Sequence, residues 1–254
     1  MSRNFELLSQ VGKMQDIAQT PEPPLAPILE DAGDESAVFT ASLSVPGAVR
    51  DEIVKLVRNL FFVPGESAPR RVVFTGTESG TGCSWICAQA AEILASQVHG
   101  SVCVVDCNLR APSLHQRFDV PNHHGLTDAL LNPGPLRSYL QRLSRSNLWL
   151  LSSGSVQENQ PSLLSSDSMR TRLGELYAQF DYVLLDVASL NTCNDGIALG
   201  SSADGVVIVV RANASRREIA RKTLQELQAA KVQALGVVLN QRTFPIPEAI
   251  YKLF

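Results

Sequence analysis

The chain has 254 residues, with 22 Lys and Arg against 25 Asp and Glu, so its net charge is −3. Such a chain lacks the positive surface of sequence-independent nucleic-acid binders and polybasic membrane binders, which argues against nucleic acid as a partner. No apolar run approaches the roughly 20 residues needed to cross a bilayer. The opening MSRNFELLSQ lacks the apolar core of a secretory signal, and five cysteines, an odd number, fit reduced thiols. We therefore expect a cytoplasmic location, with any membrane link supplied by a partner.

Two regions are predicted, residues 1–47 and residues 48–254. Within the first, 2–19 has apolar residues at three- and four-residue spacing, which is typical of a short helix that docks on another surface. That surface is either its own domain or a partner. Residues 20–47 have five prolines and five acidic residues but no Lys or Arg. This composition buries little surface and indicates an extended linker.

From residue 48 onward, apolar runs alternate with helical patterns. Strictly alternating order and strands that are apolar on both faces predict an α/β fold with a doubly wound, mostly parallel sheet. Such sheets bind ligands at the carboxyl ends of their strands. The predicted strands are 71–76, 101–106, 148–153, 181–186, 205–210 and 234–240. The predicted helices are 48–62, 83–97, 125–131, 135–144, 162–179, 194–200 and 215–230.

The first predicted strand leads into Gly76-Thr77-Glu78-Ser79-Gly80-Thr81-Gly82-Cys83-Ser84-Trp85 and then a helix. A glycine-rich turn between a strand and a helix N-terminus directs backbone N–H groups into one concavity, which suits phosphate. Ser84 stands where a hydroxyl could bind magnesium. This context favours a P-loop, as in P-loop NTPases, over an ordinary turn. The residue before the serine is Cys83, however, where a P-loop has the lysine that reaches the β- and γ-phosphates. No Lys or Arg occurs in residues 72–98.

Two aspartates stand at the ends of predicted core strands. Asp106 ends the second strand and Asp186 ends the strand at 181–186. A carboxylate beside a phosphate loop is placed to hold magnesium directly or through water. A single such aspartate could be a helix cap. Two of them, together with the loop, predict a nucleotide site.

At these residues the sequence resembles the bacterial tyrosine kinases of capsule and exopolysaccharide synthesis (BY-kinases), within the MinD/ParA-like P-loop ATPases. VVFTGTESGTGCSW resembles their Walker A segment, VCVVDCNLRAPSLH the Walker A′ segment, and FDYVLLDVASL the Walker B segment. The resemblance covers about residues 48–245. It implies ATP or ADP with magnesium as cofactors, and Asp106 and Asp186 as catalytic residues. Ser84, Asp106 and Asp186 would hold the metal. The nucleotide-binding residues would be Gly80, Thr81, Gly82, Cys83, Ser84, Trp85 and Asn240, of which Asn240 contacts adenine.

The resemblance also implies assembly and a partner. The helix RDEIVKLVRNLFF resembles the family's oligomerisation helix, carried here by Glu52, Lys55, Arg58 and Asn59. A homo- or hetero-oligomer is expected. The implied partner is a membrane-embedded polysaccharide chain-length or export protein.

Several positions depart from the family pattern. Cys83 replaces the Walker A lysine, Asn108 replaces the second Walker A′ aspartate, and Trp85 replaces a small hydroxyl residue. The family's tyrosine cluster is absent, and only Tyr251 stands near the end. These losses predict a pseudokinase, a kinase-like regulatory component of exopolysaccharide or capsule production.

Two other functions remain open. The first is a working tyrosine autokinase or ATPase that takes its cation from Arg70, Arg110 or a neighbouring subunit's Arg58. The second is a ParA-like positioning or scaffold protein that uses the basic residues of helix 215–230, which are Arg216, Arg217, Arg221 and Lys222. A solvated helix face is the simpler interpretation of that patch.

The cysteines allow two weaker hypotheses. Cys83, Cys87, Cys103 and Cys107 could bind a metal, but their places inside core elements favour small hydrophobes. Cys83 could also be a redox sensor, because a helix N-terminus lowers the pKa of a thiol.

Overall fold

The computed structural model describes residues 47–63, 68–143, 145, 147–155 and 163–242. The predicted helix at 2–19 and all but the last residue of the linker 20–47 lie outside these residues. The boundary proposed between residues 47 and 48 is therefore not tested by the fold.

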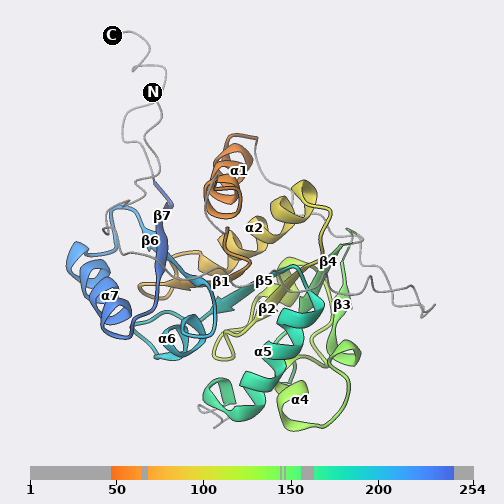
Figure 1. Cartoon of the computed structure of the whole chain (residues 1–254). Coiled ribbons are helices and arrows are strands. Elements are labelled where there is room, and N and C mark those ends of the chain that lie inside the picture. Colours follow the sequence, from red (N-terminus) through yellow and green to blue (C-terminus); the bar gives the residue numbers. More distant parts are fainter. Residues whose placement is uncertain (1–46, 64–67, 144, 146, 156–162, 243–254) are drawn as a thin grey trace, which may run out of the picture.

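The described residues form one seven-stranded sheet. Its strands are β1 (Arg71–Gly76), β2 (Val102–Asp106), β3 (Gln141–Arg142), β4 (Leu148–Leu151), β5 (Tyr182–Val187), β6 (Gly205–Arg211) and β7 (Ala234–Asn240). They lie in the order β3-β4-β2-β5-β1-β6-β7, and every pair is parallel except β3 with β4 (Figure 1). The predicted doubly wound, mostly parallel sheet is confirmed. Because β1 lies between β5 and β6, the loop after β1 emerges at the centre of the sheet.

Helices cover both faces of the sheet. They are α1 (Gly47–Phe61), α2 (Cys83–Gln97), α3 (Leu114–Arg117), α4 (Leu126–Leu131), α5 (Asp167–Gln179), α6 (Asp195–Gly200) and α7 (Arg217–Ala229), with short 3₁₀ turns η1 (Leu136–Tyr139) and η2 (Leu163–Ser165). One core cluster joins α1, α2 and α3 to one face, and a second joins α4, α5, α6 and α7 to the other. Strands covered on both faces must be apolar on both sides, which is why they read as continuous runs of Val, Leu and Ile.

Most predicted elements match the structure, but three predictions need correction. The helix expected at 135–144 is wrong, because only Leu136–Tyr139 turns and Gln141–Arg142 then pairs with β4. The helix expected at 162–179 is split, since Ser166 caps α5 through the N–H of Met169 at 3.1 Å. Helix α3 is absent from the prediction, because four residues are too few to show a helical period.

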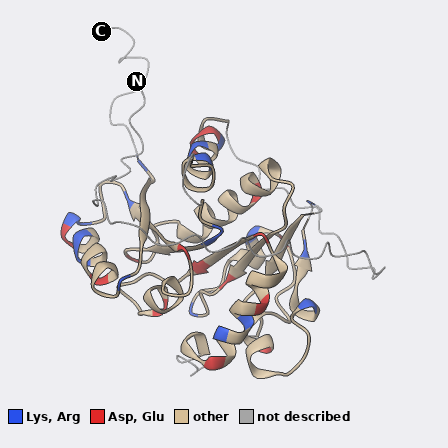
Figure 2. Ribbon diagram, viewed as in Figure 1, with Lys and Arg blue, Asp and Glu red and all other residues tan. Residues whose placement is uncertain are grey.

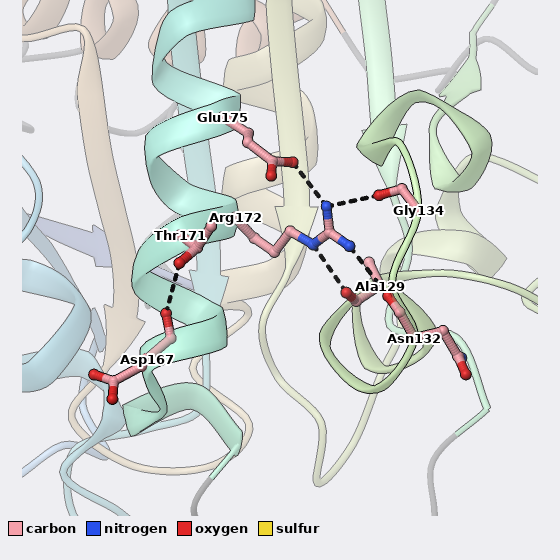
Figure 3. Close-up of polar contacts among 7 residues, drawn as sticks. All are labelled: Ala129, Asn132, Gly134, Asp167, Thr171, Arg172 and Glu175. Carbon is pink, nitrogen blue, oxygen red and sulfur yellow. Dashed lines mark hydrogen bonds and ion pairs between the residues drawn. The ribbon is translucent and has the colours of Figure 1, made fainter.

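A buried arginine joins α5 to the end of α4 (Figure 3). Arg172 donates to the carbonyl oxygens of Ala129 at 2.9 Å, Asn132 at 3.1 Å and Gly134 at 2.9 Å. It also pairs with the Glu175 carboxylate at 2.8 Å. The guanidinium thus satisfies carbonyls that the end of a helix leaves without partners. This arrangement holds the α4 region against the sheet.

Among the described residues, none of the helices is both long enough and apolar enough to span a lipid bilayer.

Candidate functional site

The loop between β1 and α2 has the backbone of a phosphate-binding loop. Gly80 and Gly82 both have φ of 81°, in the left-handed region that favours glycine. Helix α2 begins at Cys83, directly after Gly82, so its first N–H groups face the concavity of the loop. The loop is tied to β6 by the N–H of Thr77, which donates to the carbonyl oxygen of Val209 at 3.2 Å. The loop therefore has the backbone shape that the glycine spacing predicts, and phosphate binding there stays a prediction.

The end of β7 lies against the same loop. The Asn240 side chain donates to the carbonyl oxygen of Thr81 at 2.8 Å. A Cβ placed on Gly82 would overlap the Asn240 amide nitrogen. The residue that the resemblance assigns to adenine is therefore adjacent to the phosphate loop, and it also holds that loop in place. Sequence spacing alone did not indicate this second contact.

A second tie involves an acidic residue of the loop. The Ser215 hydroxyl donates to the Glu78 carboxylate at 2.6 Å and accepts from the backbone N–H of Arg211 at 3.0 Å. Glu78 adds negative charge to a loop that has no Lys or Arg of its own. The charge of Glu78 weakens the attraction of the loop for phosphate. Phosphate binding therefore depends more on the backbone amides and on a bound cation.

The two predicted aspartates are brought together. Asp106 and Asp186 are register partners on the adjacent strands β2 and β5, and both are fully buried. Asp106 accepts the backbone N–H groups of Asn108, Ser113 and Leu114 at 3.0 to 3.2 Å. Neither carboxylate oxygen of Asp186 has a hydrogen-bond partner that meets ordinary geometry among the described residues.

Burial raises the pKa of both carboxyl groups. For Asp186 it reaches about 8, because the carboxylate is desolvated and the negative charge of Asp106 lies beside it. The pKa of Asp106 rises less, to about 6, since its backbone N–H donors stabilise the charged form. Two adjacent buried carboxyls titrate as a pair, and the pair favours binding either a proton or a cation.

Cys83 lies beside this pair instead of a lysine. Burial raises the pKa of its thiol well above the usual range, and the negative charge of Asp186 raises it further. The redox-sensor hypothesis assumed a lowered pKa from the helix N-terminus, and that assumption is wrong here. Desolvation and a carboxylate outweigh the helix end, so Cys83 is a neutral thiol. It contributes no positive charge to the site.

The donor set fits magnesium. The partnerless oxygens of Asp186, the carboxylate of Asp106 and the nearby Ser84 hydroxyl are the hard oxygen ligands that this ion takes. The Ser84 hydroxyl and the Cys83 thiol both lie close enough to Asp186 to lower the pKa of that carboxyl. Asn108, which replaces an aspartate of the family pattern, instead uses its side-chain oxygen to accept the N–H of Ala111 at 3.3 Å.

The sequence analysis names three arginines that could replace the missing lysine, and two of them, Arg70 and Arg110, belong to the same subunit. The structure distinguishes between these two. Arg70 precedes β1, so it lies at the amino end of the sheet, away from the loop, and is excluded. Arg110 follows β2 at the correct edge and is exposed. The sequence analysis missed Arg117, whose positive charge lowers the pKa of both Asp106 and Asp186. It lies on α3, whose first N–H group binds Asp106, and its Nε is buried with no hydrogen-bond partner in the described part of the chain.

The remaining predicted residues, Trp85 and the four of the proposed oligomerisation helix, lie away from the aspartate pair. Trp85 is half-buried and packs against the core cluster around α1 and α2. On α1, Lys55 pairs with Glu52 of the same helix at 2.8 Å, while Arg58 and Asn59 are exposed. The proposed oligomerisation residues therefore form a surface of α1 available for contact, and the ion pair between two of them is internal to the helix.

The other two hypotheses concern the cysteines and the basic helix. No group of three or more His, Cys, Asp or Glu side chains in the described part of the chain is placed to hold a metal ion. Burial raises the pKa of Cys87, Cys103 and Cys107, as expected for thiols that pack as small hydrophobes. Arg216, Arg217, Arg221 and Lys222 are exposed, and Lys222 forms a surface pair with Glu226 at 3.7 Å. Figure 2 shows basic and acidic positions together along α7.

The sequence is similar to several curated tyrosine kinases, although no family model matches it. It is 30% identical over 200 residues to tyrosine-protein kinase YwqD of Bacillus subtilis, covering 78% of this chain and 84% of that protein. It is 26% identical to the putative tyrosine-protein kinase CapB of Staphylococcus aureus, over 72% of this chain and 80% of CapB. Against tyrosine-protein kinase wzc of Salmonella typhi it is 27% identical over 75% of this chain, but it spans only 26% of that longer protein.

Solved structures show the same fold. The chimerical protein CapA2B2 superposes with a TM-score of 0.71 and 26% identity, covering 76% of this chain and 85% of that one. The kinase domain of Escherichia coli tyrosine kinase ETK gives a TM-score of 0.71 at 24% identity, over 82% and 84% of the two chains. A ParA family ATPase from Chlorobium tepidum has a TM-score of 0.54 at 18% identity, covering 67% of this chain and 72% of that one, and so shares the fold alone. The chain therefore belongs to the bacterial tyrosine kinase family, within the P-loop ATPase fold.

Proposed function

We propose that this chain is a nucleotide-binding pseudokinase that acts as a cytoplasmic regulatory subunit in exopolysaccharide or capsule production. The observation that carries this proposal is the setting of Cys83. It is a half-buried thiol beside Asp186, kept neutral because desolvation and that carboxylate raise its pKa, at the position where the resemblance places a lysine. The rest of the site supports binding, because Gly80 and Gly82 retain the backbone of a phosphate loop.

Different residues of the chain would bind the phosphates, the base and magnesium. Backbone N–H groups around Gly80–Ser84 bind phosphate oxygens, and Asn240 positions both the loop and the base. Ser84, Asp106 and Asp186 hold magnesium, which when bound neutralises phosphate charge. Phosphoryl transfer depends almost wholly on positioning and positive charge. Removing one preorganised contact of this kind costs about 10²–10³ in rate.

In this proposal, nucleotide binding rather than phosphoryl transfer regulates the partner. A subunit that binds ATP or ADP and turns it over slowly holds one conformation for as long as the nucleotide stays bound. The partner would be a membrane-embedded polysaccharide chain-length or export protein, and α1 with Glu52, Lys55, Arg58 and Asn59 would supply the assembly surface. Relatives named as tyrosine kinases and the shared fold support this assignment.

Calorimetric titration with ATP and ADP, with and without magnesium, tests the proposal. The wild type should bind nucleotide, with phosphate release at or below the detection limit. Cys83→Lys should bind more tightly and gain phosphate release. Cys83→Met is the matched control, because methionine is about as long as lysine but carries no charge. It should show the nucleotide binding and phosphate release of the wild type.

Two outcomes would contradict the proposal. Absence of binding at millimolar nucleotide in the wild type would leave a scaffold whose loop has lost its ligand. Tyrosine autophosphorylation by the wild type that disappears in Asp186→Ala would instead establish an active kinase, with Arg110 or a neighbouring subunit supplying the cation.

A further inference from the structure

Arg117 is a cation of the candidate site that has no direct partner of its own. It is half-buried on α3, and its Nε is buried with no hydrogen-bond partner among the described residues. Its guanidinium takes part in none of the four ion pairs in that part of the chain. An unpaired buried donor is costly in a folded protein, and a bound anion would satisfy it. The described contacts therefore leave the guanidinium free to bind an anion.

The geometry of α3 directs this side chain toward the aspartate pair. The N–H groups of Ser113 and Leu114 donate to the Asp106 carboxylate, both at 3.0 Å. One turn later, the N–H of Arg117 donates to the carbonyl oxygen of Ser113 at 3.2 Å. Side chains on a helix tilt toward its N-terminus, so the guanidinium points back over the turn that binds Asp106. Burial raises the pKa of both Asp106 and Asp186, and the positive charge of Arg117 opposes that rise.

The exposed arginine after β2 has different surroundings. Burial raises the pKa of the Cys193 thiol, on the loop after β5, and Arg110 is the nearby cation that opposes this rise. Arg110 therefore lies toward that loop and solvent, whereas Arg117 lies over the carboxylates. Asp106 does not neutralise Arg117 by direct contact, because its oxygens accept three backbone N–H groups.

The order of the strands sets the direction of a bound nucleotide. Asn240, which the resemblance assigns to adenine, ends β7, and the phosphate loop follows β1. Along β7-β6-β1-β5-β2, the base end, the loop and the two aspartates follow one another across the carboxyl edge of the sheet (Figure 1). Neighbouring strands are about 4.8 Å apart, so β2 is roughly 10 Å from β1 on the side away from β7. Phosphates that extend from the loop in this direction approach β2 and α3, and the last of them comes nearest to Arg117.

We propose that Arg117 binds the terminal phosphate of a nucleoside triphosphate and makes this site prefer ATP to ADP. The inference rests on the proposed nucleotide binding and names the residue that distinguishes the two nucleotides. A loop lysine reaches both the β- and γ-phosphates, so its replacement by Cys83 weakens ATP and ADP alike. Arg117 lies on the β2 side and compensates for the third phosphate alone. A charge-assisted hydrogen bond of this kind corresponds to about 10- to 100-fold in affinity.

This role is compatible with slow turnover. An interaction that the enzyme makes equally with bound substrate and with the transition state strengthens binding without raising kcat. Arg117 would therefore hold the triphosphate in place and would not restore the phosphoryl transfer that the missing lysine supports.

Calorimetric titration of the full-length protein with ATP and ADP, with and without magnesium, tests the proposal. Without magnesium, which would share the charge of the terminal phosphate, the wild type should bind ATP about 10- to 100-fold more tightly than ADP. Arg117→Gln should lose this preference through weaker ATP binding, with its affinity for ADP unchanged. Arg117→Lys keeps the charge and should retain part of the preference. Arg137→Gln removes an exposed arginine of η1, so it is the matched control for net charge and should behave as the wild type.

Chemical modification gives a second measurement at the residue itself. Phenylglyoxal reacts with arginine side chains, and mass spectrometry locates the modified positions. Saturating ATP should protect Arg117 from the reagent, and saturating ADP should not. Arg110 should be modified equally in the presence of either nucleotide.

Failure of this inference is distinguishable from failure of the proposed function. Equal binding of ATP and ADP by the wild type, or a preference that Arg117→Gln retains, would overturn the role of Arg117 and leave nucleotide binding standing. Equal weakening of both nucleotides in Arg117→Gln would show a structural role for α3 and would also overturn it. Loss of the preference in Arg110→Gln instead would assign the contact to Arg110. Absence of binding of either nucleotide at millimolar concentration would overturn both the inference and the proposed function.

Discussion

Asp106 and Asp186 face one another as in-register partners at the ends of β2 and β5, yet among the described residues only Asp106 accepts backbone N–H groups. Three backbone N–H groups stabilise the charge of Asp106, whereas Asp186 has only the nearby Ser84 hydroxyl and Cys83 thiol, neither at ordinary hydrogen-bond geometry. The difference follows from the chain path, because the segment after β2 turns back over its own strand and forms α3. Asp186 is therefore the group that a proton or a cation must neutralise.

This relationship predicts how stability depends on pH. A carboxyl whose pKa is raised on folding binds its proton more tightly in the folded state, so stability falls as pH rises from about 4 to the folded pKa. For Asp186 that window extends to about 8. Asp186→Asn removes the ionisable group, and its free energy of unfolding should fall less between pH 5 and pH 8 than that of the wild type. Urea denaturation at these two pH values measures both slopes, and equal slopes would contradict the assignment.

Arg117 should act on the same pair. Its positive charge favours the ionised forms of Asp106 and Asp186, so Arg117→Ala should shift the titration of the pair to higher pH. It should also weaken nucleotide binding in the absence of magnesium, since the site loses its nearby cation. Arg110→Ala, on the exposed turn after β2, is the control. A larger loss in Arg110→Ala than in Arg117→Ala would transfer the role to Arg110.

Two glycines of the phosphate loop allow a matched comparison. Gly80 and Gly82 share φ of 81°, but a Cβ on Gly80 meets open space, whereas one on Gly82 overlaps the Asn240 amide. Gly80→Ala should cost only the left-handed backbone strain, about 1 kcal/mol. Gly82→Ala should cost that strain and the Asn240 hydrogen bond as well, about 2–3 kcal/mol. Thermal or urea unfolding of both variants measures the two losses, and equal losses would show that Asn240 does not hold the loop.

Arg172 should matter far more for stability than its neighbour Arg170. Arg172→Ala leaves three carbonyl groups near the end of α4 without their donor, and we expect a loss of about 3 kcal/mol. Arg170 pairs with Asp167 at 3.1 Å on an exposed surface, so Arg170→Ala should change stability by at most about 0.5 kcal/mol. Chemical denaturation of the two variants distinguishes them, and similar losses would show that the guanidinium contacts are weak.

Cys83 should react slowly with alkylating reagents. Burial and the nearby Asp186 keep its thiol protonated, and only the thiolate is nucleophilic. At pH 8 the native protein should label at Cys83 at least about tenfold more slowly than the urea-unfolded protein. Mass spectrometry of iodoacetamide-treated protein measures this rate. Rapid native labelling of Cys83 would restore the redox-sensor hypothesis that the raised pKa opposes.

Local pattern was sufficient for much of the fold. Alternating runs such as 71–76 and 83–97 reappear as β1 and α2, because buried parallel strands must be apolar and a glycine-rich turn must follow the first of them. The helix predicted for 135–144 was wrong because local pattern did not decide the structure there. Gln141 and Arg142 have no strand signal of their own, and pairing with β4 decides their conformation.

The sequence by itself therefore determined the P-loop, the two aspartates and the absence of a lysine between residues 72 and 98, since these follow from residue types at fixed spacing. Only the tertiary structure decided that Asp186 accepts no backbone N–H group within the described part of the chain, that Arg117 rather than Arg70 lies near the pair, and that Cys83 has a raised pKa. Each depends on which elements meet at the carboxyl edge of the sheet. Burial and charge at a point in space come from segments far apart in the chain, and no local spacing records them.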